Sequence, residues 1–273
     1  MSGDFLRPFL ITLAAGLATS IGAAFAFFVE PTDEKRFSPF LAISAGVMIY
    51  LCFIEMQPKA AAKMGGETQD EMDQGELLSG LVFFGSMLAS YIADRLSQKF
   101  LERLNRKTEL ENVVARTKVV DKDIRLLSMA VFNAVALAVH NFPEGIANFY
   151  ANQKDEKFGV SIAVAIAIHN IPEGIAVALP ILKSTGSRWW AFALATLSGL
   201  AQPAAALIVG VALGTRINEF IEGLIFAIVA GIMIYIATVK LYPVSLEYSA
   251  ETSGLWLIVG MAIMAVSLYL LED

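Results

Sequence analysis

The chain alternates long apolar runs with short polar connections, and the length of those runs restricts its fold more than any other feature. A helix needs about 20 apolar residues to cross a bilayer. Runs of about this length lie at residues 5–29, 37–61, 75–97, 124–151, 158–182, 188–214, 219–243 and 253–271. In lipid the backbone must satisfy its own hydrogen bonds, and these runs are too long for barrel strands. The sequence therefore predicts an all-α polytopic membrane protein, with one transmembrane domain of eight helices over residues 1–273.

Composition and charge placement support this class and suggest an orientation. The chain is 56% hydrophobic and 17% charged, whereas soluble domains have roughly 25% charged residues. Nine of its 20 Lys and Arg residues lie in or beside the connection between the third and fourth runs. Basic loops stay in the cytoplasm, so this connection, with its charged stretch at about 98–123, is predicted to be cytoplasmic and both termini non-cytoplasmic. The charged stretch reads as a surface helix or a partly disordered linker.

Several other functional classes are disfavoured by simple counts. The net charge of -6 argues against a nucleic-acid partner. Cys52 is the only cysteine, which excludes an intrachain disulfide or a multi-cysteine metal site and predicts a buried, inert thiol. The first run lacks the basic start and cleavage signal of a signal peptide, so we expect it to be a retained helix.

Two copies of one polar hexapeptide interrupt the fourth and fifth runs. They read His-Asn-Phe-Pro-Glu-Gly at 140–145 and His-Asn-Ile-Pro-Glu-Gly at 169–174, and they contain both histidines of the chain. Ionisable side chains at membrane depth are costly and by default indicate a functional site. We therefore expect the two copies to carry the chemistry of the protein.

Helical spacing places the metal-binding groups of each copy on one face. Residues four apart stack, so His140 lies over Glu144 and His169 over Glu173. The proline in each copy cannot donate to the carbonyl four residues earlier, which predicts a kink in both helices. Two imidazoles and two carboxylates suit Zn²⁺, Fe²⁺ or Mn²⁺. Polar groups that only join helices are the alternative, but they explain poorly a buried Glu repeated with a proline at equal spacing.

The connection between the two copies is short, which predicts an antiparallel pair. Residues 152–157 form a polar turn between the two runs. Identical motifs on antiparallel neighbours imply a pseudo-two-fold axis in the membrane plane. Inverted repeats of this kind are typical of transporters with a site near the midplane.

The doubled motif resembles the fourth and fifth helices of the ZIP (Zrt/Irt-like) divalent-metal transporters, most closely the ZupT-like bacterial branch. The segments 44–48, 198–201 and 230–233, with Glu55 and Pro58, extend the similarity over nearly the whole chain. The resemblance implies eight helices, non-cytoplasmic termini and a binuclear site in which both glutamates touch two metal positions. Carried over to this sequence, the metal-ligating residues are His140, Asn141, Glu144, His169, Asn170, Glu173 and Gln202.

This sequence departs from the family pattern at two positions. Gln202 stands where family members commonly carry a glutamate. A neutral amide is a weaker ligand than a carboxylate, so we expect one strong and one weak metal position. Lys240 stands where similar bacterial proteins tend to carry acidic residues; its long side chain is expected to reach the cytoplasmic surface.

The expected function is import of zinc, iron or manganese across the inner (plasma) membrane, with cobalt and cadmium as further candidate ions. The metal is then cargo, and no cofactor and no enzymatic activity are expected. The expected partners are the divalent ion and the lipid bilayer, with a homodimer left open. A membrane metalloenzyme of the di-iron oxidase type and a transporter of a non-metal solute remain alternatives, although no Glu-x-x-His motif occurs.

Overall fold

The computed structural model of the chain is built of helices in all the parts that it describes. These parts are residues 3–28, 35, 38–66, 68–115, 134–135, 138, 141–153, 156–212 and 218–272. The helices are α1 (Gly3–Ala24), η1 (Phe25–Phe27), α2 (Ser38–Leu51), η3 (Cys52–Met56), α3 (Gln57–Met64), α4 (Gln69–Ala115), the helical segment 141–153, α6 (Glu156–Thr185), α7 (Arg188–Gly199), α8 (Ala201–Ala212), α9 (Glu219–Tyr235), η4 (Ile236–Leu241), α10 (Tyr242–Tyr248) and α11 (Ala250–Glu272).

Seven segments among the described residues are long and apolar enough to cross a membrane. They are Phe5–Phe27, Ser38–Met64, Gln69–Phe100, Gly159–Leu179, Arg188–Ala212, Glu219–Tyr248 and Ala250–Leu270. Each matches one of the predicted runs, which confirms the all-α polytopic class. Of the predicted fourth helix, only the part from residue 141 and a few positions before it are described. The count of eight helices therefore stays a prediction.

Two of the spans widen into π-helix just before a proline. Pro58 follows η3 and Pro243 follows η4. Neither proline can donate to the carbonyl four residues earlier, and those carbonyls belong to Ile54 and Val239, both inside the π segments. Widening the turn accommodates the missing donor and the proline ring. Each π segment therefore has a local cause in the sequence.

The span Arg188–Ala212, which matches the sixth predicted run, is broken in the middle for a related reason. α7 ends at Gly199, Leu200 forms a turn, and α8 begins at Ala201. Pro203 has no N–H for the Gly199 carbonyl, so the regular helix cannot continue across this point. The break exposes carbonyls at the end of α7 in the interior of the protein.

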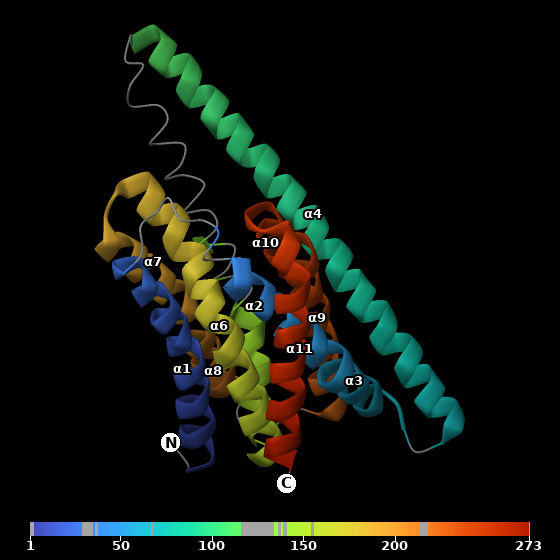
Figure 1. Cartoon of the computed structure of the whole chain (residues 1–273). Coiled ribbons are helices and arrows are strands. Elements are labelled where there is room, and N and C mark those ends of the chain that lie inside the picture. Colours follow the sequence, from blue (N-terminus) through green and yellow to red (C-terminus); the bar gives the residue numbers. More distant parts are fainter. Residues whose placement is uncertain are drawn as a thin grey trace.

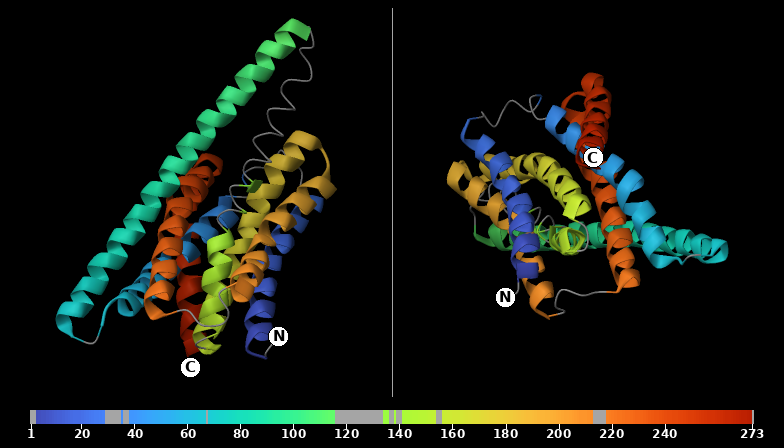
Figure 2. Two further views of the ribbon diagram at one scale, coloured as in Figure 1. Left: turned by 180° about the vertical axis from the view of Figure 1, so that it is seen from behind. Right: turned by 90° about the horizontal axis from the view of Figure 1, so that it is seen from below.

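The helices pack in two groups joined through α6. The hairpin group contains α1, the segment 141–153, α6, α7 and α8; the outer group contains α2 to α4 and α9 to α11. Contacts of α6 with α2 and α11 connect the groups. The view from below in Figure 2 shows α1, α6 and α7 on one side and α9 and α11 on the other. The largest apolar core lies between the two groups and includes Met48, Phe226 and Met233 with Ile162 and Ile166 of α6.

A buried cluster of three serines joins one end of the outer group. Ser38 begins α2, Ser245 lies on α10 and Ser253 on α11, and none of them is exposed. Their hydroxyls bond one another at 2.8–3.1 Å and also bond the Ser38 and Ser245 carbonyls. This serine cluster fixes the ends of three helices by hydrogen bonds that need no outside partner.

α4 is much longer than a membrane span and projects past the other helices (Figure 1). It runs unbroken as far as Ala115, through the first part of the charged stretch. For that part, the expected surface helix is therefore found, and not the linker that was the alternative. Residues 116–123 of the predicted stretch lie outside the described residues. Within the span, exposed apolar side chains such as Leu81, Phe84 and Leu88 line α4, a surface suited to lipid.

Ion pairs join the outer helices at both ends. Lys63 of α3 pairs with Glu222 of α9 at 2.9 Å. At the other end Lys240 of η4 pairs with Asp94 of α4, which also accepts a hydrogen bond from Tyr235 at 2.9 Å. Lys240 therefore binds the carboxylate of Asp94, and its side chain is also partly exposed. That it faces the cytoplasm stays a prediction.

Candidate metal centre

The two motif helices form an antiparallel hairpin. Near the turn, Asn152 Nδ2 donates to the Gly159 carbonyl at 3.0 Å. Farther along both helices, Glu144 meets His169. From the first pair to the second, the residue number falls on one helix and rises on the other, as in an antiparallel arrangement. The hairpin thus brings the two motif copies together, as their spacing predicts.

Three of the expected site residues meet in the centre of this hairpin. His169 Nε2 lies 2.8 Å from Glu144 Oε1, and Gln202 Nε2 donates to Glu144 Oε2 at 2.5 Å. All three side chains are fully buried. Glu144 is therefore held between an imidazole from α6 and an amide from α8, so that three helical segments contribute to one polar group.

The two motif asparagines are bound in matching ways. Asn141 Nδ2 donates to the Ser198 carbonyl at 3.2 Å, and Asn170 Nδ2 donates to the Ala15 carbonyl at 2.8 Å. The Oδ1 atom of each accepts no hydrogen bond from the described residues. In both copies the amide nitrogen thus anchors the side chain to a neighbouring helix and leaves the oxygen, a metal-ligating atom, available.

The broken sixth span supplies one of these anchors. Ser198 lies in the last turn of α7, where carbonyls lose their regular helical donors. The other anchor, Ala15, lies within α1. The sequence predicted the two asparagines as site residues but not their backbone acceptors, because every residue has a carbonyl. The one available signal was Pro203, close to Ser198, since a proline can interrupt a helix.

Glu173 and His140 complete the expected set, and the structure describes only one of them. Glu173 lies on α6, one turn beyond His169, and is fully buried. His140 lies outside the described residues. Within the described ranges, no three His, Cys, Asp or Glu side chains form a group that could hold a metal ion. A site built from the described residues therefore needs amide oxygens beside Glu144 and His169.

Motif glycines allow main chains to touch at this site. A Cβ on Gly145 would lie 2.2 Å from the carbonyl oxygen of Gln202, and one on Gly174 would lie 2.0 Å from that of Thr19. Contacts this short leave no room for a side chain. The last residue of each hexapeptide therefore brings α8 against one motif helix and α1 against the other.

Elements outside the hairpin also contact the site. Ser44 of α2 donates its hydroxyl to the His169 carbonyl at 3.3 Å, which connects the outer group to the motif. Cys52 is buried, as expected; that its thiol is inert stays a prediction. The prolines at 143 and 172 both lie within residues assigned as α-helix; the predicted kinks stay predictions.

Comparison with known proteins identifies the family. Residues 104–268 match the family model described as ZIP Zinc transporter. A protein named zinc transporter ZupT from Oceanobacillus iheyensis is 43% identical over 271 residues, covering 98% of this chain and 99% of that protein. The protein of the same name from Lysinibacillus sphaericus is 42% identical, and the match covers 99% of this chain and 100% of that protein. The one from Streptococcus mutans is 39% identical, and the match covers 99% of both chains. With its doubled motif and all-helical membrane fold, the chain belongs to the ZIP family and is similar to its ZupT-like members.

Proposed function

We propose that this protein imports divalent transition metal ions, zinc among them, through a site between the segment 141–153 and α6. The observation that carries the proposal is the buried group formed by Glu144, His169 and Gln202. The relatives are named zinc transporters. Iron, manganese, cobalt and cadmium are further candidate cargoes, since the same donor atoms serve them.

The proposed site consists of His140, Asn141, Glu144, His169, Asn170 and Glu173, with Gln202 at its edge. A metal ion entering it exchanges water for imidazole nitrogen and carboxylate oxygen, and two carboxylates balance its charge in a low-dielectric interior. The available Oδ1 atoms of Asn141 and Asn170 are harder, neutral donors. Strong and weak ligands side by side suit an ion that must be bound and then released.

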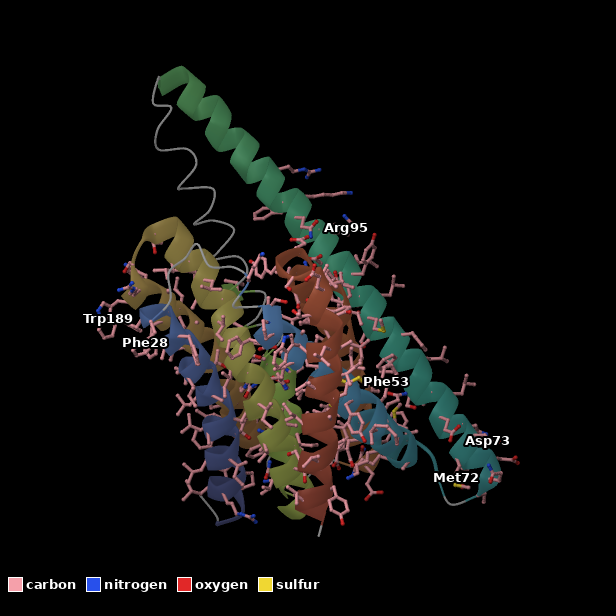
Figure 3. The ribbon with its side chains drawn as sticks, in the orientation of Figure 1. Phe28, Phe53, Met72, Asp73, Arg95 and Trp189 are labelled. Carbon is pink, nitrogen blue, oxygen red and sulfur yellow. The ribbon has the colours of Figure 1, made fainter. Side chains whose placement is uncertain are left out.

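The proposed orientation places both termini outside the cytoplasm. Arg95, Phe28 and Trp189 lie toward one end of the helix bundle, whereas Asp73 lies at the other end (Figure 3). Both termini are at the Asp73 end (Figure 1). Basic residues favour the cytoplasmic side, and exposed Trp suits the membrane interface. This supports non-cytoplasmic termini in a plasma-membrane protein.

The other functional classes receive less support. ZIP family members are transporters, which removes the reason to expect a di-iron oxidase, and a solute carrier without metal would not need paired buried carboxylates. The decisive experiment is zinc uptake into proteoliposomes containing the wild type, Glu144→Ala or Glu173→Ala. Both variants should lose uptake by at least about 100-fold, with Glu251→Gln, on an exposed position of α11, as the matched control. Wild-type uptake by correctly inserted Glu144→Ala would refute the site.

A further inference from the structure

One face of the helical segment 141–153 stays polar all the way from the proposed metal site to the turn of the hairpin. Asn148 and Asn152 follow Glu144 at intervals of four residues, so the three side chains stack on the same face. Asn148 is 0% exposed and Asn152 is 4% exposed. Nothing in the hexapeptide requires these two asparagines.

Most of the other side chains of this segment are apolar, although the buried Tyr150 hydroxyl also has no partner among the described residues. Ala147 and Ala151 belong to the largest hydrophobic core. Phe149 and Tyr150 pack with Phe5 of α1 in a second apolar cluster. The two asparagines therefore form a narrow polar strip on a helix that is otherwise packed as a membrane-spanning segment should be.

The hydrogen bonds of the strip are incomplete among the described residues. Asn152 Nδ2 donates to the Asn148 carbonyl at 2.9 Å, to Asn148 Oδ1 at 2.8 Å and to the Gly159 carbonyl at 3.0 Å. Asn148 Nδ2 and Asn152 Oδ1 find no partner there. A buried amide that only closed the hairpin would be expected to satisfy its donors, as the serine cluster does.

A purely structural role explains Asn152 better than Asn148. Asn152 holds the turn by binding Gly159, whose missing side chain lets the two main chains meet. Asn148 donates to no described residue, although it lies one turn closer to Glu144. A buried amide with an unused donor is suited to bind a water molecule, and the open acceptor Asn152 Oδ1 is suited to the outward-facing hydrogens of a hydrated cation.

We propose that Asn148 and Asn152 line the passage through which a partly hydrated divalent cation moves between the turn of the hairpin and Glu144. The inference rests on the proposed function and adds the path to it. Amide oxygens can bind the ion or accept hydrogen bonds from its waters, but they bind more weakly than carboxylates, so the ion is passed on rather than held. The turn lies at the same end of the molecule as both termini (Figure 2).

Thiol accessibility tests the passage directly, and the chain is well suited to it because Cys52 is its only cysteine and is buried. Asn148→Cys is placed in a Cys52→Ala background and treated from the side of the termini with a membrane-impermeant, positively charged methanethiosulfonate. Ala147→Cys, a buried neighbour on the apolar face, is the matched control. Asn148→Cys should react at least about 10-fold faster than Ala147→Cys, and zinc should slow its reaction.

Equal reaction rates at the two positions, or no reaction at position 148 in a variant that still transports zinc, would overturn the proposal. A second measurement uses Asn148→Val, which replaces the amide by hydrocarbon. Zinc uptake should fall about 10-fold, while zinc affinity in detergent stays unchanged because Glu144 and His169 are intact. Wild-type uptake by Asn148→Val refutes the passage alone, whereas failure of the unaltered protein to transport any divalent metal refutes the proposed function.

Discussion

The serine cluster and the motif hairpin are both buried, polar and surrounded by hydrocarbon, yet they treat their polar atoms in opposite ways. Ser38, Ser245 and Ser253 bind one another and nearby carbonyls. In the hairpin, Asn141 and Asn170 use their nitrogen atoms as anchors and keep an oxygen available. The serine cluster, which serves the fold, closes its hydrogen bonds within the protein. A group that serves an ion must leave acceptors open, at a cost in stability.

The largest change in zinc affinity is expected when a carboxylate of the hairpin is replaced. Glu144→Gln keeps the shape of the side chain but removes the charge that faces His169 and Gln202. Zinc affinity should fall by at least about 100-fold, because Glu173 then remains as the single carboxylate of the proposed site. Calorimetry in detergent measures this, with Glu247→Gln, on the exposed side of α10, as control. Unchanged affinity would mean that Glu144 serves the fold.

A smaller effect is expected at the two asparagines. Asn141→Ala and Asn170→Ala each remove one available oxygen and one anchor. Each should weaken zinc binding by about 10-fold, and by similar amounts, because the two motif copies are bound alike. Competition with a fluorescent zinc indicator measures both. A large loss in one variant and none in the other would contradict the equivalence of the two copies.

Gln202→Glu should act in the opposite direction and by only several-fold. It replaces the amide that donates to Glu144 by a second carboxylate, so the two acids repel each other without metal and bind a divalent ion together. The variant should therefore bind zinc more tightly, and its metal-free form should unfold more easily. Anomalous scattering should show a second occupied position in the variant and one dominant position in the unaltered protein. Two equally strong positions in the latter would disprove the asymmetry.

The serine cluster should affect metal binding least. Ser253→Ala removes one hydroxyl from the cluster and leaves its partners without a bond, which costs about 1–3 kcal/mol of unfolding free energy. Zinc affinity should remain that of the wild type. Thermal unfolding in detergent and calorimetry on the same sample check both halves of this prediction, and a changed affinity would show that the two polar regions are coupled.

The parts of this molecule that could be predicted are those with a local signal. The apolar runs predicted the seven described spans, and the repeat of the motif on two antiparallel neighbours predicted that side chains of the two copies, such as Glu144 and His169, meet. The π segments η3 and η4 were not predicted, because one extra residue in a helical turn does not change the apolar composition of the run. Pro58 and Pro243 were the available signals. The Lys240–Asp94 pair could not be predicted either, because its partners are 146 residues apart and many carboxylates compete for one lysine.

Gly145 has a consequence for ion size. Its place against the Gln202 carbonyl means that the spacing between α8 and the segment 141–153 is set by main-chain contact. Ligand distances to Zn²⁺ are about 2.0–2.2 Å and those to Ca²⁺ about 2.3–2.6 Å. Adding one methyl group at Gly145 would displace the helices by more than this difference. We therefore expect selection by ionic radius in the proposed site to depend on this main-chain contact, which side-chain repacking cannot relax.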